Sequence, residues 1–96
     1  MKITNVHTEI PVFFLKEDDT FVCYTPAFDL AASGDTLEEA KKSFDISCKM
    51  ILEEVVKKGA LEEMLQNYGW VKLKSRWSPP QLIGQESKDI LIPVHS

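Results

Sequence analysis

One apolar stripe constrains this chain more than any other feature. Between residues 37 and 56, apolar side chains recur at steps of three and four, the spacing of one face of an α-helix about five turns long. The stripe comprises Leu37, Ala40, Phe44, Cys48, Ile51, Leu52, Val55 and Val56. A helix with one apolar side must pack on something, so the rest of the chain has to provide a matching apolar surface.

Start and stop signals bracket this helix. In the stretch "GDTLEEA", Asp35 or Thr36 can cap the free amide groups at the helix start. Glu38 or Glu39 then occupies the position at which a capping box carries its acid. At the other end two lysines precede Gly59, a residue type that commonly ends a helix in the left-handed conformation. We therefore expect one long helix.

The surface beneath the helix is predicted to be an antiparallel sheet. Residues 9–15 and 20–25 are rich in β-branched and aromatic side chains, and the polar cluster "KEDD" between them is typical of a hairpin turn. Pro26 ends the second strand because it lacks the N–H donor that a strand ladder needs. Residues 27–33 alternate in side-chain character, which predicts a third strand.

The remainder of the chain predicts a short helix and two more strands. Residues 60–68 place apolar side chains on one side of a short helix that ends at Gly69. Residues 70–77 alternate as a strand, and residues 89–94, "DILIPV", are predicted as a further strand that Pro93 confines to an edge. The expected order is β-β-β-α-α-β-β, an α+β fold in which one long amphipathic helix packs on one face of an antiparallel sheet.

Length and composition place the chain among small globular proteins. Its 96 residues are 44% hydrophobic and 27% charged, which suits a single core. We expect one domain over residues 1–96, with its core at 9–58 and the short helix and C-terminal strands at 60–96. No apolar run approaches the roughly 20 residues that span a membrane, and the N-terminus lacks the apolar segment of a signal peptide. These features predict a cytoplasmic protein without membrane contact.

The two cysteines fit the same expectation. Cys23 falls in a predicted strand and Cys48 on the apolar side of the predicted helix, and neither has the spacing of a zinc or redox site. We expect both to be buried free thiols, because disulfides are rare in a reducing compartment.

Charge is distributed unevenly along the chain. Its net charge is −4, with 13 acidic and 7 basic residues in the segment 1–69 and an excess of bases in 70–96. An acidic body disfavours non-specific binding to nucleic acid and suits a basic partner.

The sequence offers few candidates for catalysis. His7 and His95 lie near opposite ends of the chain, without the spacing of metal ligands. A third hypothesis is an enzyme whose sheet resembles that of a nuclease in degenerate form. Such an enzyme would need several converging carboxylates to hold two metal ions, and only Asp29 and Asp35 lie near the predicted strands that would carry them. We therefore expect a non-enzymatic protein with no catalytic residues, no metal and no cofactor, and the nuclease-like enzyme is the least favoured hypothesis.

The predicted strand 70–77 carries a basic stripe. Lys72, Lys74 and Arg76 project to one face of it, with Trp70 on the same side. Such a stripe is typical of a nucleic-acid contact, in which basic side chains bind phosphates and the aromatic ring stacks on a nucleobase. Lysines on an edge strand also block edge-to-edge aggregation, so the same residues have a structural interpretation.

The strand–strand–strand–helix unit resembles the HicB antitoxin family. The resemblance covers about residues 9–56 and rests on a strand ending in Pro, about seven further residues, and then G-x-T-x-x-E-A. The matching positions are Tyr24, Pro26, Leu30, Gly34, Thr36, Glu39, Ala40 and Phe44. It implies a β-β-β-α-β fold, assembly into a dimer or tetramer, and neutralisation of HicA, a small basic mRNA interferase of prokaryotic toxin–antitoxin systems.

Many HicB-like proteins also regulate their operon through a C-terminal DNA-binding domain. This chain departs from that pattern, because no two-helix DNA-reading pattern follows Gly69. The resemblance thus favours a non-catalytic antitoxin, or a solitary relative without a toxin, that binds and occludes a HicA-type toxin. A small nucleic-acid-binding or regulatory protein that uses the basic strand 70–77 is the alternative.

Two surfaces are expected to bind partners. The exposed acids of the long helix would face a basic toxin, and they are Glu38, Glu39, Asp45, Glu53 and Glu54. The first two strands carry apolar side chains on both faces, and these include Phe13, Leu15, Val22 and Tyr24. One helix can cover only one of these faces. An apolar face of that size is uncommon on a monomer, so we expect a homo-oligomer, dimer or tetramer.

Overall fold

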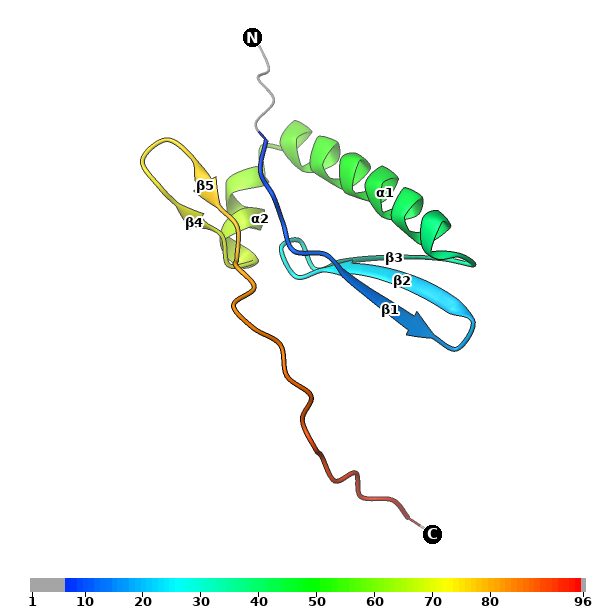
Figure 1. The fold of residues 1–96 in the computed structure, drawn as a ribbon. Coiled ribbons are helices and arrows are strands. Elements are labelled where there is room, and N and C mark those ends of the chain that lie inside the picture. The colour runs from blue at the N-terminus through cyan, green and yellow to red at the C-terminus, as the bar shows by residue number, and fades with distance from the viewer. Residues whose placement is uncertain (1–6, 96) are drawn as a thin grey trace.

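The protein has an α+β fold in which a three-stranded antiparallel sheet precedes a long and a short helix (Figure 1). The computed structural model describes residues 7–95. Its elements are β1 (Phe13–Glu17), β2 (Thr20–Thr25), β3 (Leu30–Gly34), α1 (Leu37–Lys57), α2 (Leu61–Asn67), β4 (Val71–Lys72) and β5 (Trp77–Ser78). Residues 1–6 and 96 of the expected domain, and with them most of the stretch considered for a signal peptide, lie outside the described residues.

The predicted hairpin is confirmed, but its first strand is displaced: residues 9–12 are not in a strand, and β1 includes Lys16 and Glu17, which were predicted to belong to the turn. β1 and β2 pair in the register Phe13 with Tyr24 and Glu17 with Thr20, and β2 also pairs antiparallel with β3. The hairpin turn places Asp18 at φ 57°, a left-handed conformation that Asp tolerates better than most residues. The sheet order is β1-β2-β3, which leaves β1 and β3 at its two edges.

The third strand begins later than the alternation predicted. Residues 27–29 form a turn, and β3 starts at Leu30. Asp29 has φ 49°, and its carboxylate accepts a 3.0 Å hydrogen bond from the Tyr24 hydroxyl. Ala27 is fully buried in this turn. The chain needs these residues to reverse direction between two antiparallel strands, so they are not available to extend β3.

The signals predicted for the ends of α1 are confirmed. Thr36 is the N-cap, and its hydroxyl oxygen accepts a 3.1 Å hydrogen bond from the Glu39 backbone N–H. At the C-terminus, the N–H groups of Gly59 and Ala60 donate to the carbonyl oxygens of Val56 and Val55 at 3.1 and 3.0 Å. These two bonds, with Gly59 at φ 69°, form a Schellman motif. No helix in the described part of the chain is long and apolar enough to cross a membrane.

The core consists of two small clusters. In the first, Cys23, Ala40 and Phe44 are buried where α1 lies on the sheet. In the second, Ala27, Leu65 and Trp70 are buried where α2 meets the turn before β3. Ile10 packs against both clusters and joins them.

The predicted C-terminal strands are largely wrong. Residues 70–77 do not form one strand, because the chain turns through 73–76 and leaves two-residue strands β4 and β5 as a small hairpin. Residues 89–94 do not form a strand either, and all of them are exposed. After β5 the chain runs away from the body, and the described molecule is 61 Å long (Figure 1). A strand requires a hydrogen-bonding neighbour, and the described chain supplies none to 89–94.

Candidate functional site

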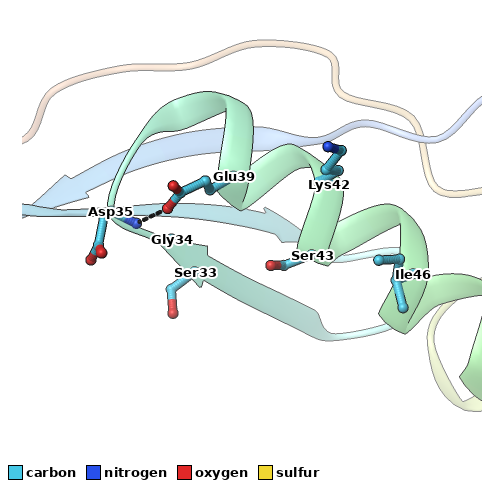
Figure 2. A pocket seen from close by; sticks show the side chains of 7 residues that line it. All are labelled: Ser33, Gly34, Asp35, Glu39, Lys42, Ser43 and Ile46. Carbon is cyan, nitrogen blue, oxygen red and sulfur yellow. Dashed lines mark hydrogen bonds between the residues drawn. The ribbon is translucent and has the colours of Figure 1, made fainter.

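The junction between β3 and α1, which carries the motif G-x-T-x-x-E-A, forms a shallow cavity of about 540 Å³. Figure 2 shows that the Glu39 carboxylate turns back to the helix start, where it accepts a 3.0 Å hydrogen bond from the Asp35 backbone N–H. The residues that line it are Ser33, Gly34, Asp35, Glu39, Lys42, Ser43 and Ile46.

The motif residues have structural roles at this junction. A Cβ atom added to Gly34 would lie 2.6 Å from the Ala40 nitrogen and 2.7 Å from the Glu39 Cβ, so only glycine lets the helix begin this close to β3. The Thr36 hydroxyl satisfies the Glu39 N–H, which the helix start leaves free, and the Glu39 carboxylate accepts from the N–H of Asp35 just before the N-cap. Ala40 is fully buried against the sheet. This part of the motif therefore builds the strand-to-helix connection.

The five acids predicted to bind a partner are all exposed on α1 but differ in their surroundings. Glu39 is engaged in the helix cap. Glu53 lies 3.9 Å from Lys49 and Glu54 lies 3.2 Å from Lys58, each one helical turn away. Glu38 and Asp45 line a shallow surface cavity together with Lys41 and Lys42. The α1 surface therefore alternates in charge and is less acidic than the five acids alone indicate.

α1 also exposes an apolar pair that the sequence analysis missed. Ile46 and Met50 expose 58% and 65% of their surface and lie one helical turn apart. Ile46 borders the cavity beside β3. The signal was present in the sequence, since both residues lie off the apolar stripe that packs on the sheet, and large apolar residues on the solvent side of a helix are typical of contact surfaces.

The predicted basic stripe does not form. Lys72 lies on β4, where its ammonium group contacts the Glu62 carboxylate at 3.1 Å and lies 5.8 Å from the Trp77 ring centre. Lys74 and Arg76 lie in the tight turn after β4, which the 2.7 Å hydrogen bond from Leu73 N–H to the Arg76 carbonyl closes. The three basic side chains therefore lie around a hairpin turn and not along one face of a strand.

Trp70, the aromatic residue expected beside this stripe, is a core residue. It is 6% exposed, and its ring stacks on Phe28 with the ring centres 5.5 Å apart. Its indole N–H donates a 2.7 Å hydrogen bond to the buried Ala27 carbonyl oxygen. This ring is not available to stack on a nucleic-acid base.

One face of the sheet has no helix or strand over it within residues 7–95. The register places Phe13, Leu15, Val22, Tyr24, Ala31 and Ser33 on this side, opposite to the side on which Cys23 and Ala32 pack under α1. We call it the open face. Leu15 is 48% exposed, and Phe13, Val22 and Tyr24 are each partly exposed. The two-sided apolarity predicted for the first strands is therefore present in the structure.

Within residues 7–95, the other carboxylates and thiols considered as candidates do not lie close enough together to form a site. Asp29 and Asp35 lie before and after β3, at opposite ends of that strand. Cys23 is buried and Cys48 half-buried, both are free thiols, and burial raises the pKa of each. No three His, Cys, Asp or Glu side chains within the described range are arranged to hold a metal ion.

Comparison with known proteins adds no relative to this description. No protein-family model, no curated protein and no solved structure matches the chain.

Proposed function

We propose that this protein is a HicB-like antitoxin, or a solitary relative of such antitoxins, that works in the cytoplasm by binding. It would occlude the RNA-cleaving site of a small basic HicA-type toxin and contribute no catalytic residue of its own. The observation that carries the proposal is the β3–α1 junction. There the motif residues Gly34, Thr36 and Glu39 fix the connection between sheet and helix, in the order expected from the resemblance.

The exposed side of α1 supports a protein partner. The helix presents acids beside the apolar pair Ile46 and Met50, and such a combination suits a contact in which charge guides approach and apolar area holds the complex. The Lys41 ammonium lies 5.2 Å from the Phe14 ring centre, so part of the basic charge on the helix is directed to the sheet edge. We assign the toxin contact to this side of α1.

Co-expression tests the proposal. The tagged protein is produced together with the product of the adjacent reading frame, a basic chain of roughly 60–80 residues in the expected case. The proposal predicts that the neighbour stops growth when produced alone, that growth recovers on co-expression, and that the two proteins co-purify. A neighbour that is harmless alone and does not co-purify would remove the toxin from the proposal and leave a solitary binding domain.

Nucleic-acid binding is the second candidate, and the β4–β5 hairpin favours it. Lys74 and Arg76 are exposed at its turn, with Lys72 beside the partly buried Trp77. Changing Lys74 and Arg76 to Glu would abolish binding to an operator-length DNA duplex, measured by fluorescence anisotropy at low salt. The same variant would still bind the toxin if α1 forms that contact, so the two functions separate in one protein.

A further inference from the structure

The C-terminal segment 81–95, here called the arm, carries six exposed apolar side chains, namely Leu82, Ile83, Ile90, Leu91, Ile92 and Val94. Leu91 is fully exposed, and Ile90 and Ile92 expose 72% and 70% of their surface. The radius of gyration is 16.6 Å, against about 13 Å for a compact domain of this length. Large apolar side chains held in water forgo the free energy of burial. The arm therefore has the composition of a segment that is covered in another state.

The outer edge of β1 is a matching surface, because no strand of the described chain pairs with it. Within residues 7–95, β1 pairs with β2 on one side only, so alternate residues direct their N–H and C=O groups to the free edge. Phe13 and Leu15 lie on the open face, while Phe14, 54% exposed, lies on the other side. This edge is apolar on both faces of the sheet. The β3 edge instead presents Ala31 and Ser33, which are small.

Pro93 restricts how the arm can pair with such an edge. In an extended strand, alternate residues turn their N–H groups to the same side. Pro93 has no N–H, so it belongs on the solvent side, and the N–H groups of Ile90, Ile92 and Val94 then face the partner strand. This register also places those three side chains on one face of the extended sheet and Leu91 on the other. The pattern is apolar on both faces, as the β1 edge is.

The arm's own β1 is poorly placed to receive residues 90–94. Leu82 and Gln85 already line a cavity of about 660 Å³ with Phe13, Leu15 and Tyr24. An extended chain advances about 3.3 Å per residue. Residues 90–94 consequently lie farther along the chain and away from the sheet in the same molecule, as the long C-terminal trace in Figure 1 shows.

We propose that residues 89–94 of one copy pair as a strand with the free edge of β1 in a second copy, and that two copies exchange their arms reciprocally. Ile90, Ile92 and Val94 then lie on one face of the extended sheet and Leu91 on the other, so both faces of the partner's edge receive apolar side chains. This inference names the contact behind the homo-oligomer expected from the sequence and is independent of the proposed toxin. Reciprocal exchange buries both uncovered surfaces and closes the assembly at two copies.

The arm itself provides the first test, because its exposed side chains can be changed without affecting the fold. Light scattering at micromolar concentration gives the mass of the full chain, of the variant I90D/I92D, and of the control Q81D/S87D, which adds the same charge at polar positions of the arm. We expect twice the chain mass of 10.9 kDa for the wild type and the control, and the single-chain mass for I90D/I92D. A monomeric wild type, or an I90D/I92D variant that keeps the doubled mass, overturns the proposal.

A second test identifies the surface that receives the arm. L15D alters the sheet that takes up the arm, and I46D places the same charge on the exposed side of α1 as its control. We expect L15D to be monomeric and I46D to keep the doubled mass. Tagged L15D should then retain untagged I90D/I92D, because that pair still contains one intact arm and one intact edge, but not untagged L15D. Loss of retention in the mixed pair contradicts arm exchange, and toxin co-purification remains a separate readout.

Discussion

The indole N–H of Trp70 donates a 2.7 Å hydrogen bond to the carbonyl oxygen of Ala27, a residue 43 positions earlier in the chain. This bond joins the region of α2 and the β4–β5 hairpin to the turn before β3. Both residues are buried, at 6% and 0% exposure. It is therefore one of the contacts that attach the C-terminal third of the protein to the sheet.

Replacing Trp70 with Phe removes this hydrogen bond while keeping an aromatic ring against Phe28. The Ala27 carbonyl oxygen then stays buried without this donor. We therefore expect the free energy of unfolding to fall by about 1–3 kcal/mol. Urea unfolding followed by circular dichroism measures it. Trp77→Phe, at a half-buried position in the same hairpin, is the control and should cost clearly less. Equal losses for the two variants would show that the Trp70 bond contributes little.

Gly34→Ala should destabilise the protein by about 1–3 kcal/mol, because the new methyl group overlaps the start of α1. Its Cβ would lie 2.6 Å from the Ala40 nitrogen. Gly84→Ala is the matched control, since nothing lies within 4 Å of the added Cβ there. The urea midpoints of the two variants measure the difference, and a Gly34→Ala protein as stable as Gly84→Ala would refute the steric role given to this glycine.

Thr36→Ala should cost about 1 kcal/mol of unfolding free energy, because the Glu39 N–H loses its cap. Thr36→Ser keeps the hydroxyl oxygen and should restore most of that loss. The comparison is made by thermal unfolding of the two variants under identical conditions. A Thr36→Ser protein as destabilised as Thr36→Ala would mean that the methyl group of Thr36, and not its oxygen, stabilises the helix start.

Tyr24 should make stability fall at high pH. Its hydrogen bond to Asp29, followed by burial and the Asp29 charge, raises the pKa of the Tyr24 hydroxyl in the folded protein. A raised folded-state pKa favours the neutral form, so this contribution is complete below the unfolded value of about 10 and is lost as pH rises through the folded pKa. Urea midpoints between pH 8 and 11 should fall more steeply for the wild type than for Tyr24→Phe.

Reversing charge at Glu38, Asp45 and Glu53 should slow association with the toxin about tenfold at low salt, with a smaller effect on dissociation. Glu39 is left unchanged because its carboxylate caps the helix. The control reverses three exposed acids away from α1, namely Glu9, Glu63 and Glu86, and so changes net charge equally. Association rates measured by stopped flow at two salt concentrations distinguish an α1 contact from an effect of net charge. Equal slowing in both proteins would point to net charge alone and away from an α1 contact.

Local sequence signals sufficed for the β1–β2 hairpin and for α1. A two-residue turn, an N-cap at Thr36 and a glycine at position 59 act within a few residues, so their effect does not depend on distant parts of the chain. The same is true of α2 (Leu61–Asn67), because Gly69 with φ 86° follows its C-cap Tyr68. The exposed acids on α1 could also be predicted, because a 3.6-residue period assigns each residue to a side of the helix.

Pairing partners and buried neighbours were decided only in the tertiary structure. The alternation in 70–77 is as regular as that of a strand, yet burial of Trp70 against Phe28 and Ala27 takes its first residue into the core, and the chain then turns. Residues 89–94 have strand composition, but within the described chain they meet no free edge and stay extended and exposed. Periodicity states which side chains can share a face. It does not state which edge is near enough to bond, because that depends on contacts between residues far apart in sequence.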